Sequence, residues 1–507
     1  MRSSPVHCLL ACILTATTAW AQPRLRAVQL VTVAETLFVA APPGDTSRLF
    51  SVQRNGTIRV HSMPNLTVRP TPFLTVPAVH TTGERGMLGL AFHPLYAQNG
   101  WFYFYYSRLE SNNTISTIIA RCRVSQSNPD LADPSTLEIV LRIPTAGNNH
   151  VSGWIGFGPD GLLYIPYGDN GVDQNSQNMT TLRGKILRID VDGPDNIPGN
   201  ADDDGFPTDN DKLYTIPSTN PYVTDPNVPD EIWVAGVRNP YRCSFDPETG
   251  DLWVCDVGGG FREEVNRLTT SSGGANLGWP CTEGNIVRQQ QCFQQIVNYT
   301  PPMFDFRQNA NPPPTIPIPG ACAIVGGHVY RGSAFPCLRG TFVFADACTG
   351  VHSLWVRGIG QVSEVYRHAV ALNGGGQSMG VDAAGELYFI TATGGISRLV
   401  PDGLVPGTPD CDNNGYYNLC ELRLGLSLDT NNNDIPDGCE GLCTDIDFNN
   451  NRVYPEDQDV IDFFSVLTGT PCPYPACDTA DFNRNSIFPE DQDVIDFFTV
   501  LAGGTCS

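Results

Sequence analysis

The chain has little positive charge. Its 507 residues include 30 lysines and arginines against 53 aspartates and glutamates, which gives a formal net charge of -23 at pH 7. Such a chain is repelled by phosphate backbones and by anionic lipid headgroups, so the composition argues against nucleic acid and anionic membranes as partners. The same excess of carboxylates is compatible with the binding of divalent cations.

Long apolar runs are lacking after the N-terminal region, and no later segment is apolar enough to span a bilayer. The early run from Cys8 to Trp20 follows Arg2 and ends at Ala19-Trp20-Ala21, which fits the cleavage pattern of a secretory signal. We therefore predict that residues 1–21 are a signal peptide. The mature chain would then be secreted, periplasmic or located at the cell surface.

Cysteine usage agrees with export. Two of the 17 cysteines lie in the predicted signal, eight lie in the middle of the chain, and seven follow residue 410. In an oxidising compartment these sets predict disulfides, with one thiol left over or paired between molecules. Local pairs such as Cys281 with Cys292, or Cys337 with Cys348, are candidates, but the sequence does not fix the connectivity.

Long amphipathic helical patterns are also few, whereas glycine and proline are abundant, with 50 and 41 residues. A strand–turn–strand unit recurs as FGPDGLLY from Phe157, FDPETGDLW from Phe245 and VDAAGELY from Val381, and each copy continues into a glycine-rich loop. Repeated antiparallel units with their loops on one face predict an all-β fold, a β-propeller with irregular insertions. A β-sandwich is the alternative.

The composition changes after the predicted propeller. The stretch VPDGLVPGTPD from Val400 to Asp410 is typical of a linker. We predict a propeller over residues 22–402, a linker with Cys-, Asp- and Asn-rich loops over 403–444, and a duplicated module over 445–507. The duplicated segment is DFNNNRVYPEDQDVIDFF from Asp447, which returns from Asp481 with few changes.

Side-chain oxygens alternate along a loop in each duplicate. This alternation suits Ca²⁺, which takes six or more oxygen ligands in flexible geometry. The candidate ligands are Asp447, Asn449, Asn451, Asp457, Asp481, Asn483, Asn485 and Asp491. An acidic, solvated surface is the alternative interpretation.

Apolar residues at helical spacing follow the first loop from Val460 to Leu467. A loop and a helix repeated twice resemble the dockerin and EF-hand-like modules. The pattern departs from the EF-hand at its usual glycine, replaced by Arg452 and Ser486, and at its twelfth position, held by Gln458 and Gln492. The resemblance implies attachment to a cell surface or a protein partner rather than catalysis.

A polar loop that ends at His150 precedes the first repeated unit, and Asp169 follows the second strand of that unit. Because Pro159-Asp160-Gly161 predicts a tight hairpin, both residues should lie on one rim of a sheet. A histidine and a carboxylate on rigid strands suit proton abstraction. A structural histidine is the alternative.

Six segments in order identify a family resemblance. They are GERGMLGLAFHP (83–94), NHVSGWIGFGPDGLLYIPYGD (149–169), RGKILRID (183–190), EIWVAGVRNPYRCSFDPETGDLWVCDVG (231–258), NLGWP (276–280) and GGHVYRGS (326–333). Together they resemble the glucose/sorbosone dehydrogenase family, the soluble aldose dehydrogenases that depend on pyrroloquinoline quinone (PQQ), over about residues 30 to 400. The resemblance implies a six-bladed propeller with PQQ on its top face.

That resemblance also implies an activity: oxidation of the C1 hydroxyl of aldoses to lactones, with electrons passed to a soluble acceptor. Hedgehog-interacting-protein-like proteins share the domain, so a non-catalytic propeller that binds a glycan or protein at the cell surface is the alternative. A propeller lactonase that uses metal-activated water is a third possibility.

The family's site residues fall on matching positions. His150 matches the general base, Asp169 a carboxylate beside it, and Arg238 and Asn239 the pair that binds the quinone oxygens. The remaining matches are Gly258 and Gly259 for carbonyls on the Ca²⁺ that touches PQQ, Glu264 for a further Ca²⁺, and Arg331 for a PQQ carboxylate.

Three departures bear on cofactor binding. Glu84 stands where the best-known members carry glutamine, Asn149 stands where they carry aspartate, and the segment from Ala347 to Leu354 has no arginine. Since PQQ carries three carboxylates, each unmatched carboxylate should weaken its binding.

Overall fold

The computed structural model describes residues 25–145, 147–307, 318, 320–356, 362–368, 370 and 375–402, and then 420–422, 427, 446, 448–449, 456–470, 480–482 and 490–502. The chain divides into two compact units, Pro23–Gly403 and one that contains Leu404–Ser507. Among the described residues, no helix combines the length and the apolar composition that crossing a membrane requires.

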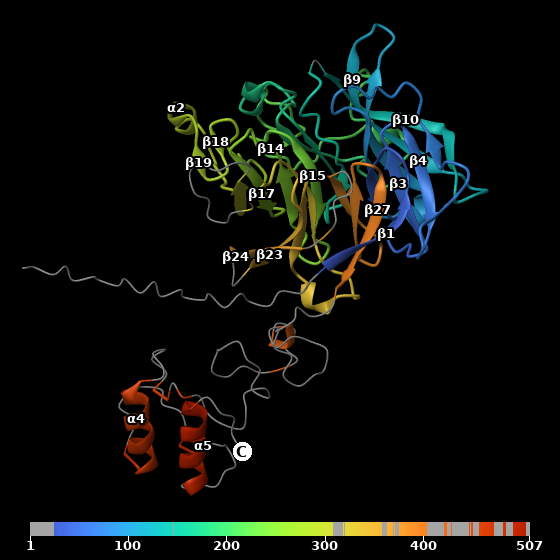
Figure 1. Cartoon of the computed structure of the whole chain (residues 1–507). Helices are drawn as coiled ribbons and strands as arrows, with labels where there is room; N and C mark the ends of the chain where they lie inside the picture. Colours follow the sequence, from blue (N-terminus) through green and yellow to red (C-terminus); the bar gives the residue numbers. More distant parts are fainter. Residues whose placement is uncertain are drawn as a thin grey trace, which may run out of the picture. The chain divides into compact units, whose positions relative to one another are not determined.

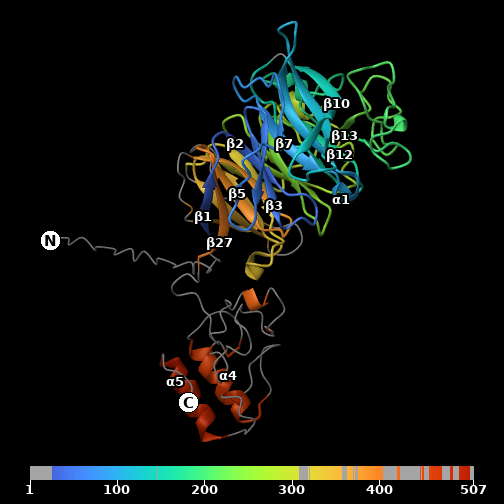
Figure 2. The same cartoon turned by 90° about the vertical axis from the view of Figure 1, so that its right-hand side faces the viewer.

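The larger unit consists of antiparallel meanders, drawn side by side in Figures 1 and 2. Four of its sheets have four strands each, ordered β10-β9-β8-β7, β11-β12-β13-β14, β15-β16-β17-β20 and β21-β22-β23-β24. Their strands are β7 (Met87–Phe92), β8 (Trp101–Leu109), β9 (Ile115–Val124), β10 (Ala132–Thr145), β11 (Gly156–Phe157), β12 (Leu163–Tyr167), β13 (Lys185–Ile189), β14 (Ile232–Ala235), β15 (Pro240–Phe245), β16 (Leu252–Asp256), β17 (Arg262–Leu268), β20 (Phe304–Arg307), β21 (Ile324–Val329), β22 (Phe342–Asp346), β23 (Gly350–Val356) and β24 (Val362–Arg367).

A nine-stranded sheet, ordered β1-β27-β26-β25-β2-β3-β4-β5 with β6 on β4, joins the two ends of this unit. Its strands are β1 (Leu25–Thr32), β2 (Thr36–Ala40), β3 (Arg48–Gln53), β4 (Thr57–Ser62), β5 (Thr67–Val68), β6 (Leu74–Thr75), β25 (Gly376–Val381), β26 (Leu387–Thr391) and β27 (Gly395–Pro401). Strand β1 pairs antiparallel with β27, from Leu25↔Pro401 to Thr32↔Gly395.

Contacts between neighbouring sheets close a ring. Strand β2 contacts β7, β7 contacts β11, β12 contacts β15, β15 contacts β21, β21 contacts β25, and β25 returns to β2. This arrangement confirms the predicted β-propeller, while the count of six blades stays a prediction. The three repeated units form the hairpins β11–β12, β15–β16 and β25–β26.

Short elements connect the strands. They are the hairpin strands β18 (Thr282–Glu283) and β19 (Ile286–Val287), the helices α1 (Tyr96–Asn99) and α2 (Gln290–Phe293), and the 3-10 helices Asp173–Ser176, Ala201–Asp203 and Pro336–Leu338.

One predicted disulfide is confirmed and one is wrong. Cys281 is bonded to Cys292, but Cys348 is bonded to Cys322 and not to Cys337. The reason is strand direction: Cys348 follows the end of β22, where the Asp346 carboxylate accepts the amide of Cys322, whereas Cys337 precedes the start of β22.

The prediction of one leftover thiol is also wrong. Among the described residues, Cys122, Cys243 and Cys255 are free thiols, and all of them are buried. They face the hydrophobic core, where they pack as small apolar side chains.

His61 on β4 makes stability dependent on pH. Its ring is fully buried against the Ser51 hydroxyl and the Leu66 carbonyl. Burial, with a smaller contribution from the charge of Arg59, lowers the pKa of His61 to about 4 from 6.5. Between pH 6.5 and 4 His61 is protonated in the unfolded chain but neutral in the folded protein, and this difference favours unfolding. The contribution of the neutral, buried His61 to the free energy of unfolding is therefore complete above pH 6.5 and is lost as the pH falls through 4.

We expect the wild type to lose about 3 kcal/mol more stability between pH 6.5 and 4 than the variant His61→Gln. Urea denaturation of both proteins across this range measures the difference, and parallel pH profiles would contradict the assignment to His61.

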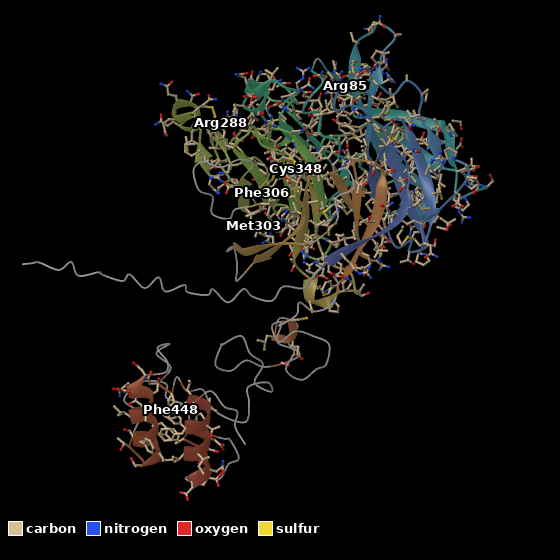
Figure 3. The ribbon with its side chains drawn as sticks, viewed as in Figure 1. Arg85, Arg288, Met303, Phe306, Cys348 and Phe448 are labelled. Atoms are coloured by element: carbon tan, nitrogen blue, oxygen red, sulfur yellow. A yellow bond between two sulfur atoms is a disulfide. The ribbon has the colours of Figure 1, made fainter. Side chains whose placement is uncertain are left out.

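The C-terminal unit contains two matching helices, α4 (Asp457–Leu467) and α5 (Asp491–Leu501). Each begins with a capping box, made by Glu456 with Asp459 in α4 and by the equivalent pair in α5. Among the described residues of this unit, four buried phenylalanines pack together, with Phe463 and Phe497 stacked at 4.1 Å between ring centroids. Phe448, another of them, is labelled in Figure 3. The sequence duplication therefore yields a structural duplication.

Candidate active site

His150 and Asp169 lie together, as the hairpin argument predicted. The Nδ1 atom of His150 is 2.6 Å from Oδ1 of Asp169. The Asp169 carboxylate is fully buried and also accepts the Gly171 amide at 2.8 Å and the Trp279 indole N–H at 2.9 Å. Because a carboxylate only accepts, we assign the imidazole proton to Nδ1, which leaves the lone pair on Nε2. Nε2 has no partner among the described residues, and the side chain is 15% exposed.

The loop that carries His150 has an unusual backbone. His150 and Ser152 have φ angles of 53° and 57°, in the left-handed region that costs side-chain-bearing residues energy. Neighbouring segments hold this conformation. The His150 amide donates to Glu84 at 2.6 Å, the Ser152 amide donates to the Asn239 side chain at 3.0 Å, and the Tyr105 hydroxyl donates to the Val151 carbonyl.

Arg238 and Asn239 are fixed by one buried carboxylate. Asp256, at the end of β16, accepts the Arg238 amide at 2.9 Å and the Asn239 amide at 2.6 Å. Burial raises the pKa of Asp256, and these two amides oppose that effect. The Arg238 carbonyl in turn accepts the Asp169 amide at 2.8 Å, so both halves of the site share one hydrogen-bond network.

The Arg238 guanidinium lies over the Trp279 ring at 5.3 Å and donates to the Val257 carbonyl at 3.0 Å. Its Nε atom is buried and has no hydrogen-bond partner among the described residues. A buried N–H without an acceptor is costly, so this atom fits an acceptor oxygen supplied by a bound group.

Glu84 and Asn149 lie at the edge of this network, and both are exposed. Besides the His150 amide, the Glu84 carboxylate has the Asn239 side-chain nitrogen at 3.4 Å. Five of the residues chosen from the sequence are therefore joined by hydrogen bonds: Glu84, His150, Asp169, Arg238 and Asn239.

Arg331 is not part of this site, so the prediction that it contacts the cofactor is wrong. Its guanidinium is held by Asp246 at 2.6 Å and by Glu248 at 2.5 Å. Asp246 follows the last residue of β15, whereas Asn239 precedes its first residue. The length of β15 separates these ends by roughly 20 Å.

Gly258 and Gly259 form the turn after β16. The Gly259 amide donates to Glu283 at 2.7 Å, so the Gly258 carbonyl of the same planar peptide points away from that buried carboxylate. Further buried carboxylates lie behind the turn, and burial, with the charge of Asp256, raises the pKa of Glu264. The buried Oδ1 of Asn266, whose amide nitrogen is 3.5 Å from Glu264, has no partner among the described residues. Carbonyls, carboxylates and an unpaired amide oxygen fit a hard cation such as Ca²⁺.

Five residues of the site were missed in the sequence: Asp256, Trp279, Glu283, Arg54 and Arg85. The Arg85 side chain, 4% exposed, donates to the Gly147 carbonyl, and Arg54 donates to the carbonyls of Gly83 and Arg85. The two arginines thus brace the loops that carry Glu84 and His150. The GERG and NLGWP segments contained Arg85 and Trp279, but only contacts across the chain reveal these roles.

Four of the eight predicted Ca²⁺ ligands of the tail, namely Asp447, Asn451, Asn483 and Asn485, lie outside the described residues. The described Asn449 side chain donates to Glu456 at 3.3 Å and to Asp462 at 3.2 Å. Asp457 and Asp491 begin the two helices with exposed side chains, and Asp481 precedes the second loop.

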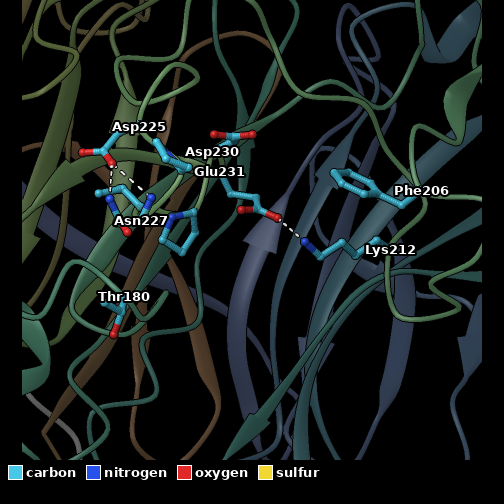
Figure 4. Close-up of a pocket in the computed structure, with 10 residues that line it drawn as sticks. Thr180, Phe206, Lys212, Asp225, Asn227, Asp230 and Glu231 are labelled. Carbon is cyan, nitrogen blue, oxygen red and sulfur yellow. Dashed lines mark hydrogen bonds and ion pairs between the residues drawn. The ribbon is translucent and has the colours of Figure 1, made fainter.

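A cavity of about 430 Å³ lies apart from the His150 network (Figure 4). Its walls come from Thr180, Phe206, Lys212 and residues 225–231, and the Lys212 ammonium is bound to Glu231 at 2.7 Å. None of the residues of the His150 network lines this cavity.

The fold and the site define a β-propeller with a histidine–carboxylate pair and an arginine–asparagine pair on one face. The sequence profile described as "Glucose / Sorbosone dehydrogenase" matches residues 38–214 and 210–398. The chain therefore belongs to the glucose/sorbosone dehydrogenase family.

Two curated relatives are similar in sequence. The "HIPL2 protein" of Arabidopsis thaliana is 31% identical over 375 residues, covering 61% of this chain and 50% of the relative. The "Hedgehog-interacting protein" of Homo sapiens is 28% identical over 324 residues, covering 60% and 40%. The chain thus spans half or less of the length of these relatives.

One solved structure with a similar fold is the PQQ-bound form of aldose sugar dehydrogenase from Streptomyces coelicolor. It has a TM-score of 0.55 and 22% sequence identity, and the match covers 75% of this chain and 99% of that chain. At this identity the likeness shows the fold.

Proposed function

We propose that the chain is an exported PQQ- and Ca²⁺-dependent dehydrogenase that oxidises the C1 hydroxyl of aldoses to lactones and passes electrons to a soluble acceptor. The observation that carries the proposal is the contact network that places His150 and Asp169 beside Arg238 and Asn239. PQQ, when bound, supplies the hydride acceptor for the C1 hydrogen.

His150 would act as the general base. Its Nε2 would take the proton of the C1 hydroxyl while the hydride leaves C1, and the carbonyl of the lactone forms. The buried Asp169 would hold the ring in the required tautomer and stabilise the imidazolium that results.

Arg238 and Asn239 would bind the quinone oxygens, with Glu84 and Asn149 at the edge of the cofactor. The unpaired Nε of Arg238 is the donor that such an oxygen would satisfy. The carbonyls of Gly258 and Gly259 would hold a Ca²⁺ beside the cofactor, and Glu264 a second one. Arg54 and Arg85 add positive charge behind the same loops.

The second candidate is a propeller without catalytic activity that binds a glycan or a protein through the same face. It is favoured by the sequence similarity to the Hedgehog-interacting protein and by Glu84, which brings a negative charge close to the site of an anionic cofactor.

Reconstitution separates the two. Purified protein is incubated with PQQ and Ca²⁺, cofactor binding is followed by absorbance, and aldoses are added with an artificial electron-accepting dye. We expect stoichiometric PQQ binding and dye reduction. A protein that neither binds PQQ nor reduces the dye would favour the binding-module function.

For the C-terminal unit we propose Ca²⁺-dependent attachment to a cell surface or protein partner. We expect chelation to unfold an isolated fragment of residues 445–507, as measured by circular dichroism, because clustered carboxylates repel one another without the ion. A spectrum that is unchanged by chelator and by added Ca²⁺ would contradict this proposal.

A further inference from the structure

Lys185, the first residue of β13, has a buried ammonium. Its side chain is 0% exposed, and no ion pair joins it to a carboxylate of the described residues. Burial lowers the pKa of Lys185 to about 7, because the charged form loses its hydration. The ammonium therefore depends on the hydrogen-bond acceptors around it.

Four backbone carbonyls surround this ammonium. The oxygens that accept from Nζ of Lys185 are those of Asn175 at 2.8 Å, Ser176 at 3.1 Å, Asn178 at 3.2 Å and Arg183 at 2.8 Å. Since an ammonium has three N–H donors and no acceptor, these oxygens satisfy it completely. All of them belong to the segment between β12 and β13 that spans residues 173–183, the Lys185 loop. The ammonium thus joins the beginning of this loop to its end.

The Lys185 loop reaches the His150 network through Asn175. The side-chain nitrogen of Asn175 donates to the Asp169 carbonyl at 2.8 Å. The Asp169 carboxylate in turn binds the imidazole of His150. Asn175 therefore gives its carbonyl to Lys185 and its side chain to the residue that orients the candidate base.

Ser176 and Gln177 make two further links. The Ser176 hydroxyl donates at 2.7 Å to the carbonyl of Val237, the residue directly before Arg238. The Gln177 side chain donates to the Trp279 carbonyl at 2.6 Å. Three consecutive residues of the loop thus bind backbone groups in three different segments of the site.

The loop is also closed tightly against the site. Gly184 has a φ of +68°, and a Cβ added there would lie 2.4 Å from the Cα of Ser176. The Gly184 carbonyl accepts the amides of Gly236 at 3.2 Å and Val237 at 3.3 Å. Because such close packing transmits displacements, a shift of the loop moves the segment that leads to the arginine–asparagine pair.

We propose that Lys185 is a positioning residue of the candidate active site: its ammonium fixes the loop, and the loop holds the histidine–carboxylate pair and Arg238 in the arrangement that the reaction needs. The catalytic part of this inference rests on the proposed dehydrogenase function, whereas the coupling of the loop to the site does not. Without the ammonium, buried carbonyls lose their donor and the loop moves to find others. A displacement of about 1 Å in a catalytic group can lower a rate about 100-fold.

The first test is hydrogen exchange of the full chain, followed by mass spectrometry at pH 6, where the ammonium is charged. The variant Lys185→Met keeps an unbranched apolar side chain and removes the ammonium. We expect the amides of residues 168–184 and 236–239 to exchange about tenfold faster than in the wild type, because the loop and the segments that it binds are released. The amides of β8 and β9 should exchange at the wild-type rate.

Arg188→Met is the matched control. It removes a second cationic side chain from β13, one that is 6% exposed and bound to Thr219 at 2.5 Å and to Asp160 at 3.3 Å. Neither of these partners belongs to the Lys185 loop. We expect lower stability in this variant, but wild-type exchange in residues 168–184 and 236–239.

Propylammonium offers a rescue, because it replaces the atoms that Lys185→Ala removes. A cavity left by a buried side chain can take up a small molecule of matching shape. Added propylammonium should restore the protection of the loop in Lys185→Ala, whereas propanol, which has the same length and no charge, should not. If Lys185→Met does not fold, Lys185→Ala is refolded in propylammonium, and exchange is measured before and after dialysis removes the amine.

Turnover is the second readout. In the PQQ- and Ca²⁺-loaded protein we expect kcat for aldose oxidation to fall about 100-fold in Lys185→Met while KM for the sugar stays within about threefold. In Arg188→Met, kcat should stay within about twofold of the wild type.

Local loss of protection in Lys185→Met supports the coupling of the loop to the site even if no protein reduces the dye and the dehydrogenase proposal fails. Four results overturn the proposal. They are wild-type exchange of the loop and site segments in Lys185→Met, an equal rise of exchange in all segments, a wild-type kcat in an active Lys185→Met protein, and exchange in Lys185→Ala that ignores the removal of propylammonium.

Discussion

Replacing His150 with alanine is expected to lower kcat for aldose oxidation by about 10³-fold, the contribution of a well-placed general base. The reason is that Nε2 is the one atom of the His–Asp pair left to accept a proton, since Nδ1 is bound to Asp169. PQQ binding and the melting temperature should change little, because the side chain is partly exposed and contributes few contacts. Stopped-flow reduction of the bound cofactor by sugar measures the step directly.

The chain offers a matched control in a second histidine–aspartate pair. His93 contacts Asp192 at 2.9 Å, but its ring is 2% exposed and packs against Phe157 in the core. We expect His93→Gln to reduce stability and to leave kcat within about twofold of the wild type. A substitution in the core, away from the active site, lowers the stability of the fold but does not change the catalytic groups. A His150→Ala protein that still oxidises sugars at the wild-type rate would remove His150 from the mechanism.

Replacing Gly258 with alanine is expected to cost about 4 kcal/mol of stability or to prevent folding of this part of the site. An added Cβ would lie 1.5 Å from the Arg262 carbonyl oxygen and 3.1 Å from a Glu283 carboxylate oxygen. Both neighbours are buried and hydrogen-bonded, so the backbone of the turn has to move and the amides on Glu283 lose their acceptor. Urea denaturation and Ca²⁺ affinity by titration calorimetry measure the two consequences.

Gly44→Ala serves as the control for this substitution. Its φ is +75° and nothing lies within 4 Å of an added Cβ, so only backbone strain of about 1 kcal/mol is expected. If Gly258→Ala is no less stable than Gly44→Ala and binds Ca²⁺ as the wild type does, the close packing of this turn is not required for the site.

The propeller was predictable because its signals are local. The repeated turn after Phe157, Phe245 and Val381 predicts hairpins from dihedral preferences of Pro, Asp and Gly, without knowledge of the rest of the chain. The same turn places His150 and Asp169 on one rim, and the structure brings their side chains within hydrogen-bonding distance. Proximity of Arg238 could not be derived in this way and depended on the family resemblance.

The misses have a common physical cause. Arg331 and Cys348 were assigned from motif and spacing, but strand direction decides which end of a blade a residue reaches. In the structure Arg331 pairs with Asp246, and Cys348 is bonded to Cys322. The hydrogen bond of Trp279 joins it to Asp169, which is 110 positions away in the sequence. The hydrogen bonds of Glu283 join it to amides that are 21 to 24 positions away. No periodicity marks such contacts, because they depend on where two loops meet.

The pairing of β1 with β27 sets the order in which the ring is completed. Leu25–Thr32 is made first during synthesis, yet its hydrogen-bonding partner Gly395–Pro401 is made last of the propeller strands. Until then, β1 and β26 lack the strand that pairs with both of them, and their unpaired edges can join other chains. A fragment that stops before Gly395 would keep those edges permanently, so soluble production of the isolated propeller requires boundaries that include Leu25 and Pro401.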